Sequence, residues 1–443
     1  MSLTTKKYSV LIFFTFVFFT YPLQSNAQNQ IKYWVTEKGI HVFFLQAQEL
    51  PILDMRLLFD AGSSRDASSE GLSYITHSLL DEGAAGLNAI QIAEKFDEVG
   101  ARFSAASSLD QSNLSLRTLT KKHYIEQALD VFIKILTKPD FFAADIELLR
   151  NRIIISIRED LQDPGFIAQK TFYKELYGGH PYGNTTKGEE NSVSRITREE
   201  IVDFYQKHLV ASNSTLVMVG AVSEEEAMNI AKLLDQSMRI GKKPAALAAP
   251  KPNFSRRTIR VSFPSKQAHI LMGHLGLERG GKDYFPTYLA NHILGGSGFS
   301  SRILNEVRLK RGLAYSAYSY LFPLQHKGPY IIGLQTEGKN IDTAIDVIEK
   351  TVSSYVSGGP STNELQHSIE SITKGFPLRI SSNASMLNYV SMIGYYGLPL
   401  DYLDTFQEKF KSIKMRQVLQ AIKNNIKLSS LITVVVGGEE SKK

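Results

Sequence analysis

The 443-residue chain contains two copies of one pattern, and this repeat constrains its fold more than any other feature. Residues 201–220 (IVDFYQKHLVASNSTLVMVG) and 418–437 (VLQAIKNNIKLSSLITVVVG) match without a gap at an offset of 217 residues. Each copy has the pattern of a helix, a polar turn and a closing apolar strand that ends in glycine. A repeat of this length indicates two similar domains in tandem rather than a short-period solenoid.

The elements between these copies predict the fold class. Apolar alternation predicts strands at residues 33–36, 39–46, 51–61, 102–117, 216–220, 270–276, 315–321, 330–336 and 432–436. Helical periodicity predicts helices at residues 72–80, 89–99, 122–136, 141–161, 169–177, 197–208, 284–294, 342–356, 362–376 and 416–426. Because strands and helices alternate in mixed order, we expect an α+β fold of two sandwich domains whose sheets are covered on one face.

A segment rich in proline, alanine and lysine separates the two halves. Residues 241–256 (GKKPAALAAPKPNFSR) show no apolar periodicity, which is typical of a linker. We therefore expect an N-terminal domain over residues 28–240 and a C-terminal domain over residues 257–443.

The first 27 residues have the three parts of a secretory signal peptide. Lys6 and Lys7 precede an apolar run over residues 8–23, and Ser25-Asn26-Ala27 fits a cleavage site. An uncleaved membrane anchor is the alternative, but Thr20 and Pro22 interrupt the run. We expect cleavage after Ala27, a periplasmic location and no further membrane span.

Charge and cysteine content exclude several classes. The formal net charge of +6 is spread along the chain, without a basic run interleaved with aromatics, so nucleic-acid binding is not expected. The chain has no cysteine, which excludes a disulfide scaffold and a thiol nucleophile.

The stretch from residue 295 to 320 (GGSGFSSRILNEVRLKRGLAYSAYSY) combines a helix and a strand. Ile303, Leu304 and Val307 form the buried stripe of a short helix, for which Gly312 is the expected stop. Arg308 lies at the end of this helix, and Tyr315 enters the following strand seven positions later. On their own, these residues indicate a capped helix with solvated arginines.

Residues 71–83 (GLSYITHSLLDEG), together with the stretch around Arg308, resemble the pitrilysin-like (insulinase-type) zinc metallopeptidases, most closely their mitochondrial-processing-peptidase-like bacterial branch. Members have an H-x-x-E-H motif here, in which two histidines bind zinc and the glutamate is the general base. On that pattern Tyr74 and Ser78 replace the histidines and His77 replaces the glutamate. The third ligand would fall near Glu147. The resemblance therefore implies that this chain binds no zinc of its own.

A shifted metal site is an alternative. His77 and Asp81 are helical neighbours, and Glu82 lies beside them, so an active hydrolase with an atypical site is conceivable. A helix-end histidine next to acidic residues is the simpler interpretation.

The second family feature is intact. The resemblance implies that Arg308 and Tyr315 hold the substrate backbone and stabilise the oxyanion of the tetrahedral intermediate, a role that suits a guanidinium and a phenol. A chain with this pair but without a zinc motif is expected to be inactive alone. It would be the non-catalytic subunit of a heterodimer whose H-x-x-E-H-bearing partner holds the zinc.

We expect the substrate to be an extended peptide, and the strand near residues 100–108 is a candidate edge for pairing with it. A stand-alone peptide-binding or structural pseudo-peptidase remains the alternative function.

Overall fold

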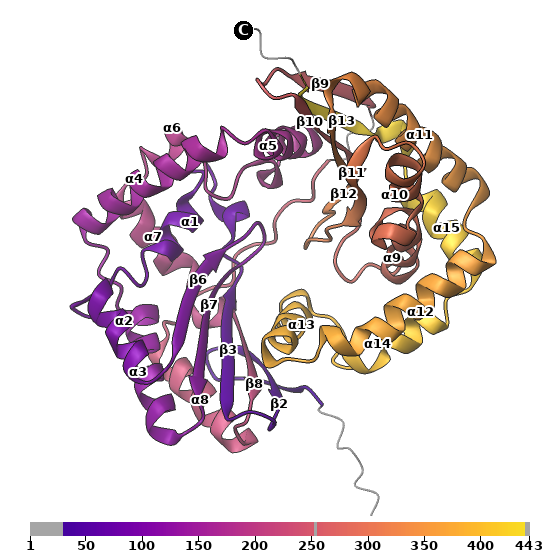
Figure 1. Ribbon diagram of the computed structural model, residues 1–443. Helices are drawn as coiled ribbons and strands as arrows, with labels where there is room; N and C mark the ends of the chain where they lie inside the picture. The colour runs from indigo at the N-terminus through magenta and orange to yellow at the C-terminus, as the bar shows by residue number, and fades with distance from the viewer. Residues whose placement is uncertain (1–29, 252–254, 439–443) are drawn as a thin grey trace, which may run out of the picture.

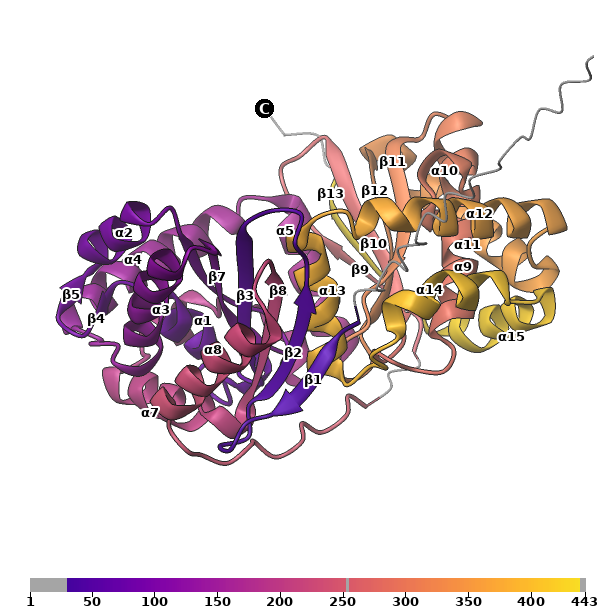
Figure 2. The ribbon, with the colours of Figure 1, turned by 90° about the horizontal axis from the view of Figure 1, so that it is seen from below.

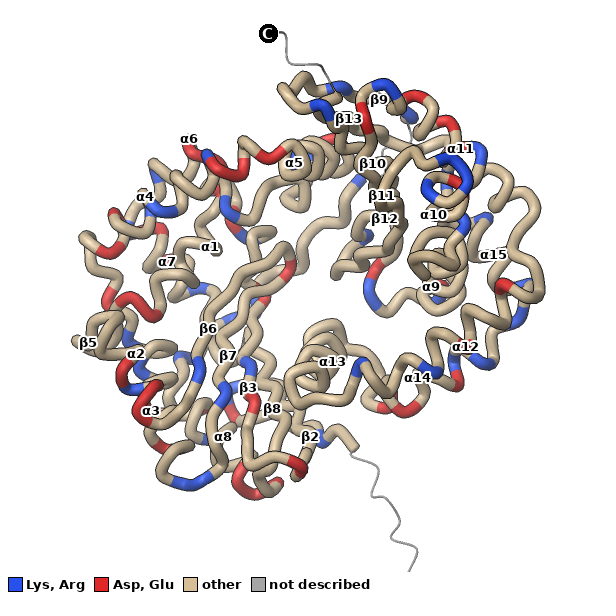
Figure 3. Tube along the Cα trace, in the orientation of Figure 1, with Lys and Arg blue, Asp and Glu red and all other residues tan. Residues whose placement is uncertain are grey.

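The computed structural model describes residues 30–251 and 255–438, and the predicted signal peptide lies outside them. Two halves of similar architecture lie side by side around a central gap (Figure 1). The strands β6 (Arg102–Ser107) and β7 (Ser112–Leu119) of the first half face β11 (Ala314–Leu321) and β12 (Pro329–Glu337) of the second. Basic and acidic residues are interspersed over both halves (Figure 3).

The first sheet has six strands, and only its β2–β8 pair is parallel. In spatial order they are β1 (Lys32–Val35), β2 (His41–Gln46), β8 (Ser214–Gly220), β3 (Ile52–Phe59), β7 (Ser112–Leu119) and β6 (Arg102–Ser107). The edge predicted for residues 100–108 is confirmed, because β6 is the last strand of this sheet.

The second sheet repeats this order. Its strands are β9 (Arg257–Val261), β13 (Ile432–Gly437), β10 (Gln267–Leu275), β12 (Pro329–Glu337) and β11 (Ala314–Leu321), with β13 and β9 parallel. The equivalent strands β7 and β12 begin at Ser112 and Pro329, which are 217 residues apart. The repeat predicted from the two ends of the chain therefore extends to both sheets.

Helices cover the outer face of each sheet (Figure 1). The helices of the first half are α1 (Leu72–Ser78), α2 (Ala89–Glu98), α3 (Lys122–Thr137), α4 (Ala143–Asp160), α5 (Pro164–Tyr177), α6 (Glu190–Val193), α7 (Arg198–His208) and α8 (Glu224–Ser237). Between α1 and α2, the short strands β4 (Gly83–Ala84) and β5 (Leu87–Asn88) form a small hairpin. Those of the second half are α9 (Tyr284–Asn291), α10 (Arg302–Leu304), α11 (Ile341–Gly358), α12 (Thr362–Arg379), α13 (Asn383–Tyr396), α14 (Tyr402–Lys411) and α15 (Met415–Asn425).

The two halves exchange helices, so the expectation that each sheet is covered on one face is wrong in part. Helix α13 packs on β8 and β3 of the first sheet, and Figure 2 shows it against these strands. Both faces of β8 are apolar: Leu216 and Met218 pack into the first-half core, while Val217 and Val219 pack in one cluster with α13. A strand that is apolar on both faces needs cover on both.

Helix α5 makes the reciprocal contact with the second sheet. Its Phe172 is fully buried in a cluster with Val434 and Val436 of β13. Gly273 of β10 leaves room for this ring, since a Cβ at that position would lie 2.8 Å from Phe172 Cζ. The halves therefore share two interlocked interfaces.

Residues 102–117 form a hairpin rather than the one long strand predicted. The chain turns between β6 and β7, where Ser108 N donates to Gln111 O (2.8 Å). The turn carries Asp110, whose buried carboxylate accepts hydrogen bonds from Tyr182, from Gln325 N (2.7 Å) and from Tyr396 Oη (3.0 Å). Gln325 and Tyr396 thereby bind the hairpin to the second half.

Residues 241–251 have neither helix nor strand and run between the halves. Arg65 Nη1 donates to Ala245 O (2.8 Å), and His326 Nε2 donates to Leu247 O (2.7 Å). The segment thus contacts both halves. Within the described ranges, no helix is both long and apolar enough to span a bilayer.

Candidate functional site

Arg308 lies on a wide helical turn that follows α10. Ser301 caps α10, and Ile303, Leu304 and Val307 are buried as predicted. The regular helix expected here is replaced by a π turn over Asn305–Leu309, in which Lys310 N donates to Asn305 O (3.0 Å), five residues earlier.

The predicted stop at Gly312 is confirmed. Gly312 has a φ of +60°, a conformation that favours glycine, and its N–H donates to Arg308 O (2.9 Å). The chain then enters β11, where a register shift between Ala314 and Ala317 interrupts the pairing with β12. Tyr315 lies within this irregularity, and 80% of its surface is exposed.

Arg308 is held between two aromatic rings. Its guanidinium carbon lies 4.2 Å from the centroid of Tyr315 and 5.0 Å from that of Phe299. Phe299 is also exposed, at 66% of its surface. Among residues 30–251 and 255–438, no carboxylate lies within ion-pair distance of Arg308. The stack therefore places an exposed phenol beside a half-buried guanidinium that has no ion-pair partner among the described residues.

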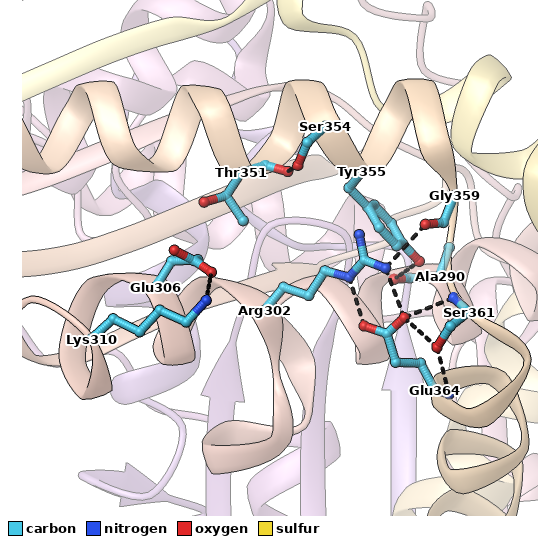
Figure 4. A network of polar contacts seen from close by, with 10 residues as sticks. All are labelled: Ala290, Arg302, Glu306, Lys310, Thr351, Ser354, Tyr355, Gly359, Ser361 and Glu364. Carbon is cyan, nitrogen blue, oxygen red and sulfur yellow. Dashed lines mark hydrogen bonds and ion pairs between the residues drawn. The ribbon is translucent and has the colours of Figure 1, made fainter.

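A polar network fixes α10, the helix that precedes the turn with Arg308 (Figure 4). Arg302 donates from Nε and Nη2 to the two carboxylate oxygens of Glu364 (2.6 and 2.7 Å) and from Nη2 to Gly359 O (3.0 Å). The ring of Tyr355 lies under the same guanidinium, with 4.8 Å between ring centroid and guanidinium carbon. Hydrogen bonds from Arg302 lower the pKa of Glu364 to about 2. The network thereby ties α10 to the first turn of α12.

The degenerate zinc-motif positions lie on α1. His77 is 1% exposed, its Nδ1 donates to Ser73 O (2.8 Å), and its ring meets that of Phe204 edge-on. Burial lowers the pKa of His77 to about 4, so the ring is neutral. Tyr74 and Ser78 are both half-buried, and Tyr74 packs against the first-half core.

These residues do not fit a zinc ion. Neither a phenol nor a serine hydroxyl supplies the imidazole that the motif requires. His77 is the one imidazole among the three motif positions: its Nδ1 donates to the helix backbone, and its buried Nε2 has no hydrogen-bond partner among the described residues. In the part of the chain that the structure describes, no three histidine or carboxylate side chains lie together as metal ligands.

The acidic residues near the motif have other partners. Glu82 pairs with Arg152 (3.4 Å), and Glu147, the position suggested for a third ligand, pairs with Arg150 on the surface of α4. Burial raises the pKa of Asp81. The geometry therefore gives no support to the alternative of an atypical metal site at His77, Asp81 and Glu82.

A cavity of about 760 Å³ lies between the two halves. Its wall includes Ser107 at the end of β6, Tyr173 on α5, Phe322 just beyond β11 and a stripe of α13. Two arginines that the sequence analysis did not single out, Arg56 of β3 and Arg279 after β10, also line it. Neither belongs to a motif, and only the packing of α13 against both halves brings them to one cavity.

The predicted site residues occupy separate places. Arg308 and Tyr315 lie outside the wall of this cavity, and Tyr315 borders a smaller hollow of about 410 Å³ with Gln335 and Glu337. Among the described residues, His77 on α1 contacts Ser73 and Phe204, whereas Arg308 stacks on Tyr315 and Phe299. The fold and the site define a two-domain peptidase-like chain that has the arginine–tyrosine pair but carries tyrosine, histidine and serine at the three zinc-motif positions.

Comparison with known proteins identifies the family. Residues 44–190 match the family model described as insulinase (peptidase family M16), and residues 195–372 match that of the peptidase M16 inactive domain. The chain belongs to peptidase family M16, in agreement with the resemblance found in its motifs.

Solved structures show the same fold. A peptidase M16 inactive domain from Pseudomonas fluorescens superposes with a TM-score of 0.89 at 32% identity, covering 93% of this chain and 99% of that one. A protease from Helicobacter pylori superposes with a TM-score of 0.83 at 17% identity, covering 92% of this chain and 99% of that one.

Two curated relatives differ in how they are named. A Helicobacter pylori protein named non-peptidase homolog YmxG is 22% identical over 92% of this chain and 94% of its own length. A Bacillus subtilis protein named uncharacterized zinc protease YmxG is 23% identical over 81% of this chain and 86% of its own length. The name of the first agrees with the expectation that this chain alone is inactive as a peptidase.

Proposed function

We propose that this chain is the non-catalytic subunit of a periplasmic, heterodimeric zinc metallopeptidase. Its partner would be a homologue with an intact H-x-x-E-H motif, which holds the zinc. This chain would supply Arg308 and Tyr315 to the shared site.

One observation carries the proposal: the half-buried Arg308 is stacked on the exposed Tyr315 in a chain whose own zinc-motif positions are occupied by Tyr74, His77 and Ser78. The carbonyl oxygen of a peptide gains negative charge when it is attacked, and it is stabilised by donors already in position. The guanidinium of Arg308 and the phenol of Tyr315 are two such donors. A partner surface docked over this stack would place its substrate within their reach.

The test compares the purified chain alone with the chain mixed with its candidate H-x-x-E-H-bearing partner. Zinc content by atomic emission and hydrolysis of a peptide library are measured for each. We expect no zinc and no hydrolysis with this chain alone, and hydrolysis on mixing beyond that of the partner alone. Stoichiometric zinc in the isolated chain would contradict the proposal.

The cavity between the halves favours one second candidate, a stand-alone peptide-binding pseudo-peptidase. A cavity of about 760 Å³ with aromatic walls is large enough for several side chains of an extended peptide. This function predicts peptide binding by the chain alone and no gain of hydrolysis on mixing with any homologue.

A further inference from the structure

The cavity between the two halves has an unbalanced charge. Two of its four cationic side chains are neutralised: Lys170 pairs with Glu189 (2.8 Å) and Lys187 with Asp160 (2.7 Å). The other two, Arg56 and Arg279, have no carboxylate within ion-pair distance anywhere in residues 30–251 and 255–438. The cavity therefore keeps two uncompensated guanidiniums.

Arg56 is held in place by neutral groups only. Its Nε donates to Ser115 Oγ (3.0 Å) and its Nη1 to Asn388 Oδ1 (2.8 Å). The nearby Asp54 is already bound by Arg117 through two hydrogen bonds (2.7 and 2.9 Å). Burial accordingly lowers the pKa of Arg56, and Asp54 offsets this only in part. A half-buried cation without an acid favours an anionic ligand.

Arg279 approaches the same cavity from the second half. Its guanidinium carbon lies 5.5 Å from the Tyr396 ring and 5.9 Å from the Tyr284 ring. Its Nε is buried and has no hydrogen-bond partner in the described chain. Hydrogen-bonding capacity thus remains on a guanidinium at the cavity wall.

One stripe of α13 connects the two arginines. Asn388, Ser391, Met392 and Tyr396 recur at helical spacing and line the cavity. Asn388 contacts Arg56, and Tyr396 contacts Arg279. Between them Ser391 is 3% exposed, and its Oγ is another buried polar atom without a partner among the residues described. Apolar side chains such as Phe166 and Phe322 complete the wall.

We propose that this cavity binds carboxylate groups of an extended peptide, from acidic side chains or from a free C-terminus, between Arg56 and Arg279. The guanidiniums donate to the carboxylates, Ser391 Oγ supplies a further donor, and the aromatic walls cover the apolar parts of the peptide. This inference rests on the proposed function, which supplies the class of ligand, a peptide. It adds the chemical group by which this chain would bind that peptide.

The test measures binding of labelled peptides to the purified chain by fluorescence anisotropy. Three peptides of equal length separate the two sources of carboxylate: acidic side chains with an amidated C-terminus, neutral side chains with a free C-terminus, and neutral side chains with an amidated C-terminus. We expect at least one carboxylate-bearing peptide to bind about ten-fold or more tightly than the fully neutral one, with the difference shrinking at high salt.

The variants Arg56→Met and Arg279→Met should each remove most of this preference, and Arg56→Lys should keep part of it. Arg239→Met is the matched control, because Arg239 also stacks on a tyrosine (4.3 Å from the Tyr205 centroid) but does not line the cavity. A circular-dichroism melt verifies that each variant is folded.

Equal binding of all three peptides, no binding of any of them, or a preference that survives both methionine variants would overturn the inference. Its failure is distinct from that of the proposed function. If the mixture with the partner hydrolyses peptides and this hydrolysis depends on Arg308, the proposed function is supported even when the carboxylate preference is absent.

Discussion

The guanidinium carbon of Arg308 lies 4.2 Å from the centroid of the Tyr315 ring, although the two residues come from different elements, a π turn and a β-strand. The turn at Gly312 reverses the chain between them, and the register shift in β11 leaves Tyr315 exposed. The two donors are therefore arranged before any substrate or partner arrives, which is the condition for electrostatic stabilisation of a transition state.

The phenolic hydroxyl of Tyr315 can be tested separately from its ring. Tyr315→Phe keeps the stack on Arg308 but removes the donor. We expect kcat of the mixed peptidase to fall about 100-fold with little change in KM, as for the loss of one oxyanion donor. The melting temperature should not change, because the side chain is 80% exposed. An unchanged kcat would mean that the hydroxyl of Tyr315 does not stabilise the transition state.

The ion pair of Arg302 and Glu364 predicts a pH dependence of stability. The pKa of Glu364 is about 2 in the folded chain, below its ordinary value near 4.5, so its stabilisation is present above pH 4.5 and is lost as the pH falls towards 2. Glu364→Gln keeps the capping box with Ser361 but removes the charge. We expect it to lower the free energy of unfolding by about 1 kcal/mol at pH 7 and by less at pH 3. Urea titrations at both pH values measure this difference, and equal losses would contradict it.

His274 predicts a second pH dependence, in a higher range. Its Nδ1 donates to Leu275 O (2.9 Å) and its Nε2 accepts from Lys427 N (3.1 Å), so the folded chain requires the neutral ring. Burial lowers its pKa to about 4 from about 6.5, and its contribution to stability is therefore full above pH 6.5 and is lost as the pH falls towards 4. His274→Gln should flatten this part of the urea profile, whereas the exposed His123→Gln should leave it unchanged.

The exchanged helices predict that the two halves unfold together. Phe172→Ala empties a fully buried site between α5 and the second sheet, and we expect it to lower the free energy of unfolding by about 3–5 kcal/mol. The exposed Phe142→Ala should cost no more than about 0.5 kcal/mol. Calorimetry should show a single transition for both variants. Two separated transitions would mean that the helix exchange does not couple the halves.

Much of the fold could be predicted because its determinants are local or repeated. The match of residues 201–220 with 418–437 anticipated two domains of similar architecture, and the spacing of Ile303, Leu304 and Val307 anticipated the buried face of the short helix before Arg308. The family motifs supplied the candidate site residues, and the roles of Arg308 and Tyr315 stay a prediction.

The features that form the cavity between the halves could not be predicted, because they depend on packing between residues that are distant in sequence. Helix α13 was not predicted, because it contacts the first sheet and its own half and therefore has no single apolar stripe. The turn at Asp110 was missed because its partners, Tyr182 and Tyr396, are distant in sequence. Arg56 and Arg279 carry no local signal either, since only the placement of α13 brings them to one cavity.

The central claim, that Arg308 completes a site on another subunit, is tested most directly by kinetics of the mixed peptidase with Arg308→Ala. The matched control is Arg311→Ala, because Arg311 lies three residues away and pairs with Glu306 (2.5 Å). The account predicts that Arg308→Ala lowers kcat about 100- to 1,000-fold while Arg311→Ala leaves it nearly unchanged. Equal activity of the mixture with the native chain and with Arg308→Ala would contradict the shared site.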